Sequence, residues 1–123
     1  MTNGFIKISD NESLDKFLAQ SKDAPVIILK HSNSCGISSQ AYTQMSIFGR
    51  PLGIVIVQEA RGVSDEIERR TGVGHETPQL LIFSKGEVVW TASHGQIKAA
   101  AVEAALEEIR AKDAEAVVSE ARP

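Results

Sequence analysis

His31-Ser32-Asn33-Ser34-Cys35-Gly36-Ile37-Ser38 separates two segments of different hydrophobic pattern and contains the only cysteine of the chain. The run before it, Val26-Ile27-Ile28-Leu29, is continuously apolar, which is typical of a central strand covered on both faces. The run after it has helical apolar spacing and predicts a helix from Cys35 to Phe48. The apolar face of that helix is expected to be Ile37, Ala41, Met45 and Phe48. The quoted stretch is therefore a strand-to-helix turn.

Cys35 occupies a chemically favourable place in this turn. The first backbone N–H groups of a helix have no intrahelical partner, and the helix dipole puts partial positive charge there. Both effects favour the thiolate, which is the nucleophilic form. A dithiol enzyme has a second cysteine three residues on, but this chain has Ser38, whose hydroxyl can only hydrogen-bond the sulfur. We therefore predict a monothiol redox protein, the alternative being a buried, inert cysteine.

The rest of the chain alternates strands and helices. Residues 5–8 predict a strand, and Ser9 and Glu12 predict a capping box for a helix over 12–21. Residues 54–57 predict a second buried strand, followed by a helix capped by Ser64 and ending at Gly72. Strands over 79–84 and 87–92 form a hairpin around Lys85-Gly86. The last helix is expected to bury Ile97, Ala101, Ala105 and Ile109.

The resulting order, βαβαβαββα, predicts an α/β fold with a mixed central sheet. Crossovers make the early strands parallel, the hairpin adds an antiparallel strand, and helices cover both faces. The length of 123 residues fits one domain, which we place at residues 1–112, with 113–123 as a frayed or disordered tail. With a cysteine opening its second helix, this is the element order of the thioredoxin fold.

Composition excludes several classes of function. The net charge of −3 argues against a nucleic-acid partner, whose binding surface should be basic. The apolar runs are too short to span a membrane. A single cysteine allows no internal disulfide and favours a reducing, cytoplasmic location. His31, His75 and His94 do not have the spacing of a zinc site with Cys35, so no metal is expected.

Several motifs, in one order over residues 26–97, together resemble a known family. They are Lys30-His31-Ser32, Cys35-x-Ile37-Ser38, Val57-Gln58-Glu59-x-Arg61, Thr71-Gly72-Val73-x-His75-Glu76-x-Pro78-Gln79, Gly86-Glu87-Val88-Val89-Trp90 and Ala92-Ser93-His94. The chain resembles the monothiol bacilliredoxins, which are thioredoxin-like general-stress proteins of bacillithiol-using bacteria.

The resemblance implies an activity and a site. The activity is removal of bacillithiol from protein mixed disulfides, with Cys35 as nucleophile and the small thiol as co-substrate rather than a resident cofactor. The partners are then thiolated client proteins, and we expect a monomer. The resemblance also implies that Thr77–Pro78 is a cis bond facing the cysteine. Thr77 then offers backbone groups to an extended client, and His75 lies in the same loop.

Gly36 departs from the family pattern, which has proline after the cysteine. Glycine supplies an N–H that proline lacks, but it also loosens the helix start. The resulting Cys35-Gly36-Ile37-Ser38 is close to the Cys-Gly-Phe-Ser motif of monothiol glutaredoxins, which use glutathione and carry a [2Fe–2S] cluster. Their Gly-Gly-x-Asp stretch is missing, because Ser93-His94-Gly95-Gln96 stands in its region. A third interpretation is a non-catalytic interaction module.

Overall fold

The structure is a computed structural model that describes residues 4–34 and 36–121, with side chains to residue 115. Its strands are β1 (Phe5–Lys7), β2 (Val26–His31), β3 (Leu52–Ile56), β4 (Gln79–Ser84) and β5 (Glu87–Ser93). Its α-helices are α1 (Asn11–Ala19), α2 (Gly36–Phe48), α3 (Arg61–Thr71) and α4 (Ala99–Ala121), with short 3₁₀ turns η1 (Gln20–Lys22) and η2 (His94–Gln96). The predicted order of strands and helices is confirmed.

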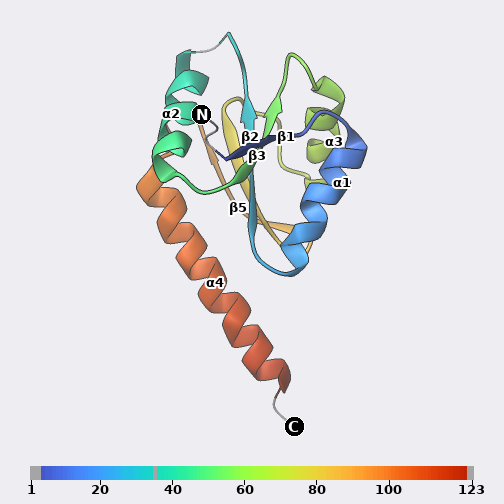
Figure 1. Ribbon diagram of the computed structural model, residues 1–123, viewed down its shortest axis with the longest axis vertical. Coiled ribbons are helices and arrows are strands. Elements are labelled where there is room, and N and C mark those ends of the chain that lie inside the picture. Colours follow the sequence, from blue (N-terminus) through green and yellow to red (C-terminus); the bar gives the residue numbers. More distant parts are fainter. Residues whose placement is uncertain (1–3, 35, 122–123) are drawn as a thin grey trace.

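The sheet has the strand order β1-β3-β2-β4-β5, which puts β2 at its centre. β1, β3 and β2 run parallel, whereas β4 is antiparallel to β2 and β5 is antiparallel to β4. Helices α2 and α4 cover one face, and α1 and α3 cover the other (Figure 1). Ile27 and Leu29 of β2 pack on the first face and Ile28 on the second, so the continuous apolar run is buried on both sides as predicted.

Two predicted helix caps were wrong. The α1 capping box uses Asp10, whose carboxylate accepts the Ser13 N–H at 2.8 Å, rather than Ser9 and Glu12. Helix α3 begins at Arg61, so Ser64 lies inside it and is buried. The Ser64 hydroxyl is engaged in a hydrogen bond with the ring of His75 instead of capping the helix. Gly72 does end α3, in the left-handed conformation with φ of 73°.

The helix faces also differ from prediction at two positions. Ile37, at the start of α2, is 46% exposed rather than buried. Ala101 is exposed as well, and α4 packs instead through Val102, Ala105, Leu106 and Ile109. Helix α4 continues past the expected boundary at residue 112 to Ala121, and the Ser84 hydroxyl donates to the Asp113 carboxylate at 2.7 Å.

Gly53 shows how closely α1 approaches the sheet. A Cβ at this position of β3 would lie 2.6 Å from the end of Ile8 and 3.0 Å from the ring of Phe17. Both neighbours are buried, and at these distances they must shift to admit a methyl group. We predict that Gly53→Ala lowers the free energy of unfolding by about 1–3 kcal/mol through overpacking, as measured by urea denaturation.

Gly62 provides the matched control for that substitution. A Cβ there meets nothing within 4 Å, and the residue lies in α3. Gly62→Ala should raise the free energy of unfolding by about 0.4–1 kcal/mol because alanine restricts the unfolded chain. If both variants are stabilised, or both are destabilised, the close approach of Ile8 and Phe17 is not what determines the effect of alanine at Gly53.

Candidate functional site

The candidate site lies where β2 passes into α2. β2 ends at His31, a turn covers Asn33 and Ser34, and α2 begins at Gly36, so the predicted strand-to-helix turn is confirmed on both sides. Cys35 itself lies outside the described residues. The turn is at the carboxyl end of the central strand, at the end of the sheet away from the α4 C-terminus (Figure 1).

The turn before Cys35 is held by side chains from two elements. The Ser32 N–H donates to the hydroxyl of Ser38 at 3.3 Å, and Ser38 is fully buried. Gln58, from the segment after β3, donates to the Ser32 hydroxyl at 2.8 Å and accepts the Asn33 N–H at 3.1 Å. Ser38 therefore fixes the backbone of the turn, a role that its predicted bond to the sulfur did not include. Gln58 was noticed in the sequence only as part of a family motif.

Thr77–Pro78 is a cis peptide bond, as the resemblance implied. Gln79, the next residue, pairs with Lys30 near the end of β2, so the strand register brings Pro78 to the same end of the sheet as the turn. The Pro78 carbonyl accepts the His94 N–H at 2.9 Å. Within residues 4–34 and 36–121, the backbone of Thr77 makes no hydrogen bond.

His75 and His31 lie on different sides of the sheet. The His75 ring is hydrogen-bonded to the Ser64 hydroxyl of α3 at 3.1 Å, and the backbone N–H of His75 donates to the Glu68 carboxylate at 3.2 Å. The His31 ring lies 5.3 Å from the ring of Tyr42 on α2. The loop that carries His75 is thereby fixed to α3, while His31 belongs to the α2 side. The structure does not bring the two histidines together.

Burial lowers the pKa of both histidines below the ordinary 6.5, and the nearby Lys30 cation further lowers that of His75. A base whose pKa is lower in the folded state binds fewer protons there than in the unfolded chain. Stability must therefore fall as the pH drops below 6.5. The Glu66 carboxyl, with its pKa lowered to about 2 by Arg69 and Arg70, affects stability only below its ordinary 4.5.

We therefore predict that the free energy of unfolding decreases between pH 7 and pH 5, and that His31→Phe makes this decrease shallower. Phenylalanine keeps the ring beside Tyr42 but does not titrate. Urea denaturation of both proteins at pH 5, 6 and 7 measures the slopes. Equal slopes for the two proteins would contradict a burial-shifted His31.

Lys30 is a feature that sequence reasoning missed. It is the penultimate residue of β2 and is 0% exposed. Its ammonium has no hydrogen-bond partner in the described part of the chain, and burial lowers its pKa despite the opposing charges of Glu68, Asp65 and Glu76. The Oε1 atom of neighbouring Gln79 is also buried and unpartnered among those residues. In the sequence, Lys30 stood out only as the first residue of the Lys30-His31-Ser32 motif and as a lysine directly after an apolar run.

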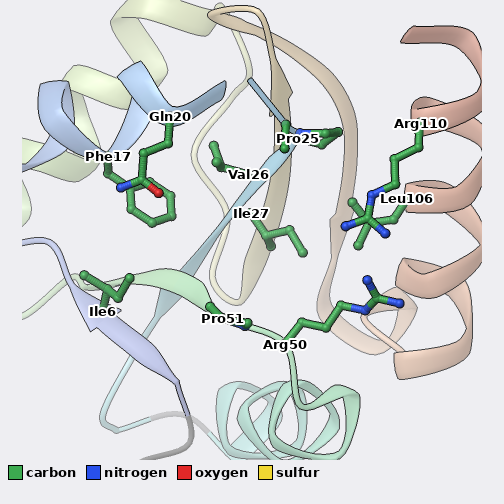
Figure 2. Close-up of a pocket in the computed structure, with 11 residues that line it drawn as sticks. Ile6, Phe17, Gln20, Pro25, Val26, Ile27, Arg50, Pro51, Leu106 and Arg110 are labelled. Atoms are coloured by element: carbon green, nitrogen blue, oxygen red, sulfur yellow. The ribbon is translucent and has the colours of Figure 1, made fainter. Parts of the chain in front are cut away.

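Other candidate sites are not supported by the described residues. Within residues 4–34 and 36–121, no cluster of His, Cys, Asp or Glu could hold a metal ion, and no helix has the length and apolarity to cross a membrane. A cavity of about 310 Å³ is lined by Pro25, Pro51, Arg50 and Arg110, among others (Figure 2). Those prolines precede β2 and β3, so this cavity is at the end of the sheet opposite the turn.

Comparison with known proteins identifies the family. Residues 6–102 match the family model of the monothiol bacilliredoxin BrxC. The chain belongs to the monothiol bacilliredoxin family. A solved structure described as having a thioredoxin fold is similar to this chain at 35% identity, with a TM-score of 0.77 over 83% of this chain and 93% of that one.

More distant solved structures show the same fold. A thioredoxin mutant from Halobacterium salinarum has 17% identity and a TM-score of 0.68, covering 86% of this chain and 90% of its own. The Fasciola hepatica thioredoxin has 10% identity and a TM-score of 0.68, covering 84% and 97%. The thioredoxin-like fold predicted from the element order is thus confirmed, and family and fold together support a thiol–disulfide redox role for this bacilliredoxin.

Proposed function

We propose that this protein removes a low-molecular-weight thiol, bacillithiol, from mixed disulfides on client proteins. The observation that carries the proposal is the turn before a single cysteine, which side-chain hydrogen bonds hold in place. Ser32, Ser38 and Gln58 fix the backbone beside Cys35, and Ser38 stands where a dithiol enzyme has its second cysteine. A site of this kind favours a nucleophile that cannot resolve its own adduct.

The proposed reaction has two balanced steps. The Cys35 thiolate attacks the sulfur of the small thiol, a new disulfide forms between them, and the client leaves as a thiolate that takes up a proton. A second small-thiol molecule, as thiolate, then attacks the adduct and leaves as a small-molecule disulfide, which restores the Cys35 thiolate. The protein needs no resident cofactor in either step.

The flanking residues have distinct proposed roles. Gly36 opens α2 and supplies an N–H where proline has none, which favours negative charge at the neighbouring sulfur. Thr77 pairs its open backbone with the extended client, and cis-Pro78 fixes the turn that presents it. His75 holds that loop to α3 through Ser64 rather than contacting the substrate directly.

Intact mass spectrometry tests the proposal. The reduced protein is mixed with a peptide–bacillithiol mixed disulfide and, separately, with the peptide–glutathione analogue. We expect one bacillithiol adduct, formed quickly and removed by free bacillithiol. Protein alkylated at its single cysteine is the control and must form none. An adduct from glutathione alone would indicate the glutaredoxin-like activity, and no adduct from either would indicate a non-catalytic module.

A further inference from the structure

A cleft separate from the cavity beside Arg50 and Arg110 adjoins the turn before Cys35, on the side of that turn away from Pro78. Its volume is about 530 Å³, within the usual range for small-molecule sites. One wall is the turn itself, through Ser32 and Asn33 before Cys35 and Ser39 after it. The other walls are β1, β3 and the side of α2 that carries Tyr42. Any group seated in this cleft is therefore next to the segment that contains the nucleophile.

The lining of the cleft has three chemical zones. Phe5 and Tyr42 meet edge to face, with 4.9 Å between ring centroids, and provide an apolar wall. Serine and asparagine side chains of the turn provide hydrogen-bonding groups beside it. Lys7 provides a cation at the rim, where it is half-exposed and pairs with Glu59 at 2.7 Å. These zones suit a small, partly polar molecule whose carboxylate shares the three N–H donors of the Lys7 ammonium with Glu59.

The sheet order separates this cleft from the expected client position. The client pairs beside β4, at Thr77, whereas the cleft lies over β3 and β1, on the other side of central β2. Transfer of the small thiol requires that its sulfur, not that of the client, is the one attacked. The two halves of a mixed disulfide then need separate places on either side of the turn.

We propose that this cleft binds the non-protein half of the mixed disulfide, a low-molecular-weight thiol whose carboxylate pairs with Lys7. The inference rests on the proposed function and adds the place where the small thiol binds and the residue that pairs with its carboxylate. After the first step the same half remains in the cleft, bonded to Cys35, until the second small-thiol molecule removes it.

Lys7→Gln tests this assignment by steady-state kinetics. With a peptide–bacillithiol disulfide, which bears carboxylates on the small thiol, we expect KM to rise about 3- to 5-fold at unchanged kcat, the loss typical of an exposed ion pair. With a peptide–cysteamine disulfide, which bears none, KM should stay unchanged. Lys7→Arg should restore the wild-type KM because it restores the positive charge.

Lys98→Gln is the matched control, because Lys98 is also exposed and lines a different cavity between α2 and η2. It removes the same charge and should leave both KM values unchanged. An active wild type with an unchanged Lys7→Gln variant overturns the subsite while the proposed function stands. A rise in KM confined to Lys98→Gln places the small thiol in that other cavity. A wild type inactive toward both disulfides overturns the proposed function itself.

Discussion

Cys35→Ser is expected to lower the rate of small-thiol transfer from a mixed disulfide by at least about 1,000-fold, as for the loss of other catalytic nucleophiles. The thiolate is the attacking species, and a serine hydroxyl is not ionised at neutral pH. No other cysteine in the chain can replace it. The rate is measured by following release of the reduced client peptide by chromatography.

The fold should survive this substitution, because hydrogen bonds among Ser32, Ser38 and Gln58 hold the turn, and the substitution leaves these three residues unchanged. Far-ultraviolet circular dichroism and the urea midpoint should therefore match the wild type. Ser38→Ala is the informative companion, since it removes the hydroxyl that accepts the Ser32 N–H but leaves Cys35 in place. Transfer that persists in a folded Cys35→Ser protein would contradict Cys35 as the nucleophile.

Much of the fold was predictable because its signals are local. The continuously apolar Val26–Leu29 run and the Lys85-Gly86 turn each specify an element by themselves. Residues whose role depends on distant neighbours were missed or misplaced. Ser64 reads as a helix cap in the sequence, yet its partner His75 is eleven residues away. Ala101 and Ile37 fit a helical stripe, but the direction of each helix face depends on the packing of the sheet.

The features of the candidate site likewise divide into those that local sequence patterns predict and those that depend on residues distant in the chain. The strand-to-helix turn and Ser38 follow from spacing, and the cis bond before Pro78 came only from the family resemblance. The hydrogen bonds of Gln58 to Ser32 and Asn33 require the end of β3 to lie beside the end of β2. No local sequence pattern predicts that these two strands are neighbours. The cleft beside Lys7 likewise needs the edge strand β1 next to β3, a pairing of residues far apart in the chain.

Lys30→Met is expected to raise the free energy of unfolding at pH 7 by about 1–4 kcal/mol, the range found when buried ion pairs are replaced by apolar residues. Lys30 is fully buried, and its ammonium has no hydrogen-bond partner among the described residues. Methionine has a similar length and needs no partner. The carboxylates of Asp65, Glu68 and Glu76 belong to exposed residues, so water solvates them when the cation is removed.

The pH dependence separates this charge effect from better packing. Burial lowers the pKa of Lys30 in the folded protein below its ordinary 10.5. Between this lowered pKa and 10.5, the unfolded chain therefore binds more protons than the folded one. Wild-type stability should therefore rise with pH in that window relative to Lys30→Met. Lys16→Met, at an exposed lysine paired with Glu12, is the control and should change stability by less than about 0.5 kcal/mol. A destabilised Lys30→Met protein would instead show that the buried ammonium stabilises the end of β2, and with it the turn that carries Cys35.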